Sequence, residues 1–255
     1  MLILLVNDDG IHAPGLAAME HALQRLGEVH VVAPATEQSG VAHSITFRTP
    51  LSFRQVRERG WAVDGTPADC VKLGVTQVCK RKPDLVVSGI NGGLNAGINV
   101  LYSGTVAAAV EASLYRINSF AVSLEYTENG AMPFDEAANI AVGVIEKVLE
   151  QKEKAGHVTP ELYNVNIPIK AIGVTSTVKT VPMDPNQYWG SFEQRTAPNG
   201  FPYYWLVGRP IPKEAFEETS ELTDLVALAK GFVTLTPLDF DRTKRDTLQA
   251  IQGYF

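Results

Sequence analysis

Two adjacent carboxylates near the start of the chain have the clearest chemical potential. Asp8 and Asp9 directly follow an apolar run, and two later apolar runs are followed by a hydroxyl-bearing loop and a Gly/Asn-rich loop. Neighbouring carboxylates favour a bound cation unless both are fully solvated in a turn. Carboxylate, hydroxyl and amide oxygens suit Mg²⁺, Mn²⁺ or Ca²⁺ better than Zn²⁺ or Cu²⁺. We therefore expect a site for a hard divalent cation.

A glycine-rich segment points to an anion beside this cation. Residues 89–104 hold five of the 21 glycines in the chain, with three asparagines among them. Glycine lets backbone amides approach a ligand closely. Ser103, Gly104 and Thr105 then open an alanine-rich helical pattern, and free amides at the start of a helix bind anions. We predict a phosphate site here; the alternative is a flexible loop before a capped helix.

Several other phosphate chemistries lack their motifs in this sequence. There is no GxxxxGK[ST], GxGxxG or GxSxG, which argues against P-loop NTPases, dinucleotide folds and serine hydrolases. A phosphatase with an aspartyl nucleophile usually shows DxD, whereas Asp8 and Asp9 are adjacent. His43 lies in a candidate site loop. It either stabilises an anion, transfers a proton or satisfies local hydrogen bonds.

Composition limits the class of protein. The 255 residues are 45% hydrophobic, enough for a sizeable core, and the net charge of -6 without a basic run argues against nucleic acid as a stable partner. The apolar start lacks a basic n-region, and no apolar segment reaches the roughly 18 residues that a membrane span needs. Cys70 and Cys79 fall on opposite faces of a predicted helix, so neither a disulfide nor a zinc site is expected. We expect a cytoplasmic protein.

Apolar runs alternate with helical patterns over the first 170 residues, which is typical of buried parallel strands joined by helices. The predicted strands are 2–6, 29–33, 85–88, 120–124 and 162–167, and the predicted helices are 14–27, 66–78, 104–114 and 136–152. This order predicts a doubly wound, mostly parallel, Rossmann-like α/β sheet. Ligands of such sheets bind beyond the carboxyl ends of the strands, where the polar loops fall.

Residues 171–255 have a different character. Up to about residue 212 the pattern is alternating and aromatic, with Val174, Val178, Tyr188, Trp189, Phe192, Tyr203, Tyr204 and Trp205. We predict extended hairpins that use these aromatics in an oligomer interface; the alternative is packing on the parent domain. A helix at 222–230 and a strand at 232–236 follow. The whole chain, 1–255, is expected to form a single domain.

Five motifs, in order and spanning nearly the whole chain, resemble those of the SurE family. They lie at 4–10, 33–46, 65–71, 88–95 and 103–105, and the segments 164–168 and 231–238 also match. Members of this family are the stationary-phase survival proteins, metal-dependent 5'(3')-nucleotidases. One departure is visible, because many relatives carry a histidine where this chain has Asp239. No proton-transfer role of that histidine carries over.

The resemblance implies one divalent cation per subunit, Mg²⁺ or Mn²⁺, with Ca²⁺ as a substitute in a crystal. Its ligands would be Asp8, Asp9, Ser39 and Asn91. It also implies hydrolysis of nucleoside 5'-monophosphates, with 3'-monophosphates and short polyphosphate as further substrates, by homodimers or homotetramers.

We expect metal-assisted hydrolysis without a covalent intermediate. The expected phosphate-binding residues are Asn95, Ser103, Gly104 and Thr105, and the expected catalytic residues are Asp8, Asp9, Asn95 and Ser103. Either aspartate orients or deprotonates the attacking water. The alternative function is a non-catalytic protein that binds a nucleotide or a sugar phosphate.

Overall fold

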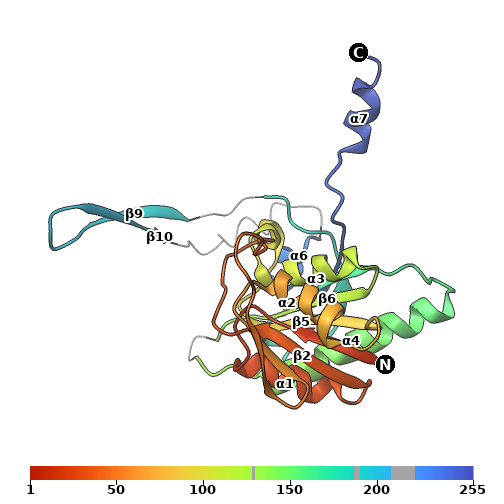
Figure 1. Cartoon of the computed structure of the whole chain (residues 1–255). Coiled ribbons are helices and arrows are strands. Elements are labelled where there is room, and N and C mark those ends of the chain that lie inside the picture. Colours follow the sequence, from red (N-terminus) through yellow and green to blue (C-terminus); the bar gives the residue numbers. More distant parts are fainter. Residues whose placement is uncertain (128–129, 187–189, 208–221, 255) are drawn as a thin grey trace.

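A nine-stranded sheet forms the centre of the computed structural model, which describes residues 1–127, 130–186, 190–207 and 222–254 (Figure 1). Its strand order is β3-β4-β2-β1-β5-β6-β7-β11-β8. Neighbouring strands are parallel except for the β3–β4 and β7–β11 pairs, which are antiparallel. The predicted doubly wound, mostly parallel sheet is confirmed.

The elements have the following bounds. The strands are β1 Leu2–Val6, β2 Glu28–Pro34, β3 Phe53–Arg57, β4 Gly60–Val63, β5 Leu85–Gly92, β6 Asn118–Leu124, β7 Leu162–Ile167, β8 Val178–Thr180, β9 Ser191–Thr196, β10 Pro202–Val207 and β11 Val233–Leu238. The helices are α1 Pro14–Leu23, α2 Pro67–Leu73, α3 Gly104–Leu114, α4 Phe134–Lys154, α6 Asp224–Ala229 and α7 Arg245–Ile251.

Helices cover both faces of the sheet. Ile3 and Leu5 of β1 belong to the core that α1 and α4 close, whereas Leu4 and Val6 belong to the core beneath α2 and α3. Side chains alternate between the faces of a strand, so a strand covered on both sides must be apolar throughout. All five residues of β1 are buried, which explains the uninterrupted apolar run.

The order of the strands reverses at β1. The chain passes from β1 to β2 on one side and later returns to β5 on the other side. Such a switch point leaves a crevice at the carboxyl ends of the two flanking strands. The residues after β1 and the end of β5 therefore meet at one place, which is where the candidate site forms.

The amino-terminal half differs from the sequence prediction in its strands. Strands β3 and β4 were not predicted, because β3 is exposed along its whole length and β4 has four residues. Strand β5 does not stop at Ser88 but continues to Gly92, since Asn91 and Gly92 pair with β6 after a register shift.

The predicted helix 66–78 is α-helical only to Leu73, and a π-helical turn, Gly74–Val78, follows. Cys79 comes after that turn, so its predicted place inside an α-helix is wrong. Both thiols are free in this structure. Thr66 caps α2, with Pro67 at its first position.

A two-stranded ribbon of β9 and β10 projects from the body (Figure 1). This confirms a hairpin in the aromatic segment, although Tyr188 and Trp189 lie outside the described residues. Phe192 is 69% exposed and Trp205 is 57% exposed, so these aromatics do not pack on the parent domain. Helix α7, which was not predicted, also projects and has no buried residue.

The predicted helix near 222–230 is α6, and the predicted last strand is β11. Among the described residues, no helix is both long and apolar enough to cross a membrane.

Candidate metal and phosphate site

The start of α3 holds the carboxylate of Asp8, which follows β1 and is only 4% exposed. Thr105 donates its hydroxyl to Asp8 Oδ1 at 2.6 Å and its backbone N–H to Asp8 Oδ2 at 3.1 Å. A Cβ on Gly104 would lie 3.0 Å from the Asp8 Cβ, so a side chain at this position would crowd the carboxylate of Asp8. Burial raises the pKa of Asp8, and the bonds from Thr105 oppose that rise.

Asp9 is half-buried and accepts a 3.4 Å hydrogen bond from the Gly92 backbone N–H. Burial, followed by the charge of Asp8, raises the pKa of Asp9 to about 6. Within the described residues, neither aspartate takes part in an ion pair. Two crowded carboxylates without a cationic partner are stabilised by a divalent cation.

Neutral oxygens complete the donor set. A cavity of about 210 Å³ is lined by Asp8, Ser39, Gly40, Asn91, Gly92, Leu94, Asn95, Asn99, Tyr102 and Ser103. Asn91 donates its side-chain amide to Gly93 O at 2.8 Å, which leaves its amide oxygen as the free ligand atom. Ser39 is exposed, and its hydroxyl donates to Glu37 Oε1 at 2.6 Å.

These donors fit a hard cation. No cluster of three or more His, Cys, Asp or Glu side chains suited to a metal occurs in the described part of the chain. The site is therefore built from two carboxylates and neutral oxygens, which are the donors that Mg²⁺ and Mn²⁺ favour.

Asn95 lies in a buried polar network on the sheet. Its side-chain amide donates to Ser123 Oγ at 2.8 Å, and its backbone N–H donates to Asn166 Oδ1 at 2.8 Å. Its carbonyl oxygen accepts from the amides of Asn164, at 2.7 Å, and Asn166, at 3.1 Å. From the sequence, residues 164–168 stand out only as part of the family resemblance. The alternation of Asn164, Val165 and Asn166 on a strand was the available signal that two amides share one face.

Some backbone N–H groups in the first turn of α3 already have hydrogen-bond partners within the protein. Ser103 caps the helix by accepting the Val106 N–H at 3.1 Å, and the Thr105 N–H is bound to Asp8. Ser103 lines the cavity together with Asp8, and Gly104 lies against Asp8. In this structure Thr105 therefore positions a carboxylate, and its predicted contact with phosphate stays a prediction.

His43 turns toward α3, where its Nε2 lies 2.9 Å from Glu111 Oε2. Lys72 Nζ binds the other oxygen of Glu111 at 2.7 Å. The 43–46 loop is further anchored because Thr66 donates its hydroxyl to Ser44 O and the Thr46 N–H binds Asp69. Of the roles weighed for His43, the local hydrogen bond is the one that the structure shows.

Glu111 was missed in the sequence. The available signal was a single charged residue among the alanines of a predicted helix that should be covered on one face. With only 3% of its surface exposed, it anchors the loop that carries Ser39 four residues before His43.

The fold and these donors define an α/β protein with a candidate cation site at the strand switch point and a helix start beside it. The family model "Survival protein SurE" matches residues 3–188. The chain belongs to the SurE family. It is 49% identical over its whole length to "5'-nucleotidase SurE" of Rhodopirellula baltica, covering 98% of that protein.

Two further SurE proteins are similar to this chain over nearly their whole length. "5'-nucleotidase SurE 1" of Thermus thermophilus is 42% identical over 99% of this chain and 97% of its own length. The crystal structure of SurE protein from Aquifex aeolicus superposes with a TM-score of 0.82 at 37% identity, covering 99% of this chain and 98% of that one.

Proposed function

We propose that this protein hydrolyses nucleoside 5'-monophosphates to nucleoside and inorganic phosphate, using one Mg²⁺ or Mn²⁺ per subunit. The observation that supports this most directly is the pair Asp8 and Asp9 at the switch point. Asp8 lines one cavity with Ser39, Asn91 and Ser103, and Asp9 accepts from the N–H of Gly92, which lines the same cavity. The names of the full-length relatives support the reaction class. Nucleoside 3'-monophosphates and short polyphosphate are proposed as further substrates.

Different residues of the chain are assigned to metal binding, to the orientation of Asp8 and to the orientation of water. Asp8 and Asp9, with the oxygens of Ser39 and Asn91, would hold the cation, which supplies Lewis acidity when bound. Thr105 fixes Asp8 in one orientation. Asp9 is the less enclosed carboxylate, and on that ground we assign to it the orientation of the attacking water.

The phosphate is assigned to the part of the cavity formed by Ser103 and Asn95, beside Asp8. The start of α3 at Ser103 and Gly104 offers partial positive charge to its oxygens, because backbone N–H groups converge there. Asn95 completes that part of the cavity, and its four hydrogen bonds keep it rigid. Preorganised donors stabilise charge that develops in the transition state.

Hydrolysis of AMP with Mn²⁺ or Mg²⁺, with and without EDTA, tests this function. We expect activity that EDTA abolishes, and a loss of at least a hundredfold in Asp8→Asn. Asp246→Asn on the projecting helix α7 is the matched control and should retain activity. Metal-independent turnover, or full activity in Asp8→Asn, would contradict the proposal. A binding protein would take up AMP and release no phosphate, and an aspartyl-phosphate enzyme would form a covalent adduct on Asp8.

We propose further that residues 171–255 assemble the protein into homodimers or homotetramers in the cytoplasm. The exposed aromatics of the β9–β10 ribbon support the assembly, since exposed apolar patches usually mark interfaces. Replacement of residues 191–207 by a short Gly/Ser linker should lower the mass measured by light scattering. An unchanged mass would contradict this role for the ribbon.

A further inference from the structure

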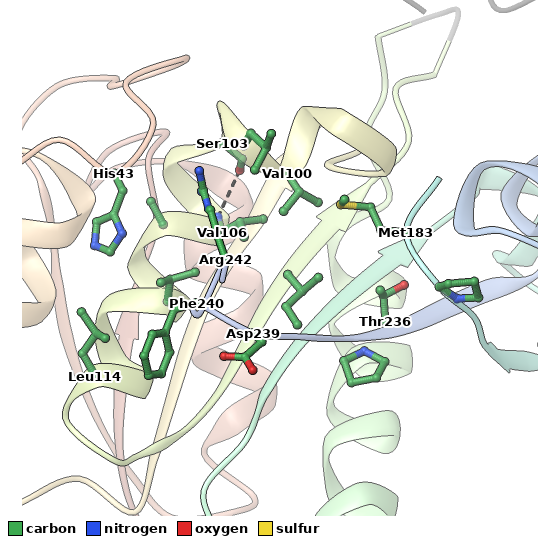
Figure 2. Close-up of a pocket in the computed structure, with 16 residues that line it drawn as sticks. His43, Val100, Ser103, Val106, Leu114, Met183, Thr236, Asp239, Phe240 and Arg242 are labelled. Atoms are coloured by element: carbon green, nitrogen blue, oxygen red, sulfur yellow. Dashed lines mark hydrogen bonds between the residues drawn. The ribbon is translucent and has the colours of Figure 1, made fainter. Parts of the chain in front are cut away.

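A second cavity of about 650 Å³ adjoins the candidate site (Figure 2). One wall is a stripe of α3 formed by Val106, Val110 and Leu114, which recur every four residues. Figure 2 shows Met183 and Thr236 on one side of the cavity, and Leu114 and Phe240 on the other. The volume lies within the range of small-molecule sites, and the mixture of apolar walls and few polar groups is typical of them.

The two cavities meet at Ser103, which lines both. Ser103 begins α3, whose first turn faces Asp8, and the apolar stripe of the same helix continues into the larger cavity. A phosphate ester bound beside Ser103 can therefore extend its ester group along α3.

Thr236 provides an unsatisfied polar group in this cavity. It is only 2% exposed and lines the cavity, and its hydroxyl has no hydrogen-bond partner within the described residues. Asn164 lies directly opposite on β7, and its Oδ1 is likewise unpartnered among those residues. Buried polar groups are normally satisfied. Of the two residues only Thr236 lines the cavity, so its hydroxyl is the group that fits a ligand carrying hydroxyl groups.

We infer that this cavity is the subsite for the nucleoside part of the substrate. The planar base packs against the apolar stripe of α3, and a ribose hydroxyl binds Thr236. Asp239, Arg242 and His43 line the same cavity and supply polar contacts for the base edge. This inference rests on the proposed function, and it identifies where substrate recognition beyond the phosphate occurs.

A pair of matched variants tests the subsite. Thr236→Val removes the unpartnered hydroxyl at nearly constant volume. Thr234→Val does the same at a fully buried, equally unpartnered threonine of β11 that is not among the cavity-lining residues. We expect Thr236→Val to lower kcat/KM for AMP about 3- to 10-fold, as for one lost hydrogen bond, and Thr234→Val to leave it unchanged. Both should hydrolyse glycerol 2-phosphate, which has no base, like the wild type.

A third variant, Val110→Trp, fills the cavity. It should lower kcat/KM for AMP at least tenfold, spare glycerol 2-phosphate and abolish adenosine binding measured by calorimetry. Equal losses on both substrates, or no loss on AMP, overturn the subsite. A changed mass of Val110→Trp in light scattering also overturns it, because a second copy of the chain would then cover the cavity. Failure of the proposed function is distinct: the wild type would hydrolyse neither phosphate ester while still binding adenosine.

Discussion

Replacement of Glu111 by glutamine tests the network that holds the 43–46 loop. The Glu111 side chain is 4% exposed and binds His43 and Lys72, which are 33% and 39% exposed. Hydrogen bonds to a charged group contribute about 1.5–3 kcal/mol, against about 0.5–1.5 for neutral pairs. The loss is thus about 1 kcal/mol per bond, reduced by solvent screening of the exposed partners.

We therefore expect Glu111→Gln to lower the free energy of unfolding by about 1–2 kcal/mol at pH 7. For a chain of this size that corresponds to a fall in Tm of about 2–8 °C. Urea unfolding followed by fluorescence gives the free energy. The control is Glu146→Gln, whose partner Arg25 and own side chain are 42% and 45% exposed, so about 0–1 kcal/mol is expected.

The effect of Glu111→Gln should also depend on pH. Burial alone would raise the pKa of Glu111, but the bonds from His43 and Lys72 lower it overall. A lowered pKa means that the stabilisation is present above the unfolded value of about 4.3 and is lost as the pH falls through the folded value. The difference in unfolding free energy between the variant and the wild type should therefore shrink as the pH falls below about 4.3. This account would be refuted if Glu111→Gln were as stable as Glu146→Gln at pH 7. It would also be refuted if the difference in unfolding free energy between Glu111→Gln and the wild type persisted in acid.

Two glycines and one buried carboxylate give further predictions. Gly15→Ala should cost about 2–3 kcal/mol in urea unfolding, because its Cβ would lie 2.1 Å from a backbone carbonyl oxygen of β5. Gly143→Ala on α4 should instead stabilise by about 0.5–1 kcal/mol, since nothing lies within 4 Å of its Cβ; equal effects would refute the steric argument. Asp224→Ala should cost about 3 kcal/mol and lower kcat, because the N–H groups of Gly97 and Asp184, 2.8 and 2.9 Å away, lose their buried acceptor. Wild-type stability in that variant would refute the last prediction.

The central fold could be predicted because its strands are buried on both faces. Runs such as β1 are apolar throughout, and the intervening helices show a clear period, so their order alone implies the sheet and its switch point. Strand β3 has the opposite character. All five of its residues are exposed, and it is held by pairing with β4, a contact that no local pattern encodes.

The candidate site could be predicted as a set of donor types but not as a set of contacts. The loops after β1 and β5 meet by topology, which places Asp9 near Gly92. Asp8 binds Thr105, which is 97 positions away in the sequence, and His43 binds Glu111, which is 68 positions away. Such pairings depend on the depth and rotation of α3 against the sheet. The glycine at position 104 is explained only by the close approach of α3 to Asp8, which the sequence does not reveal.

The electrostatics of the site constrain how it can bind an anion. The chain has a net charge of -6, and the charge of Glu37 adds to those of Asp8 and Asp9 by raising the pKa of both. A phosphate entering this cavity meets the carboxylate of Asp8, and the charges of Asp9 and Glu37 act on the same place, so its binding requires a bound cation and the backbone amides of α3 together. We therefore expect the KM for AMP to depend steeply on divalent cation concentration and only weakly on NaCl. A strong NaCl dependence at saturating Mn²⁺ would show instead that mobile surface cations attract the substrate.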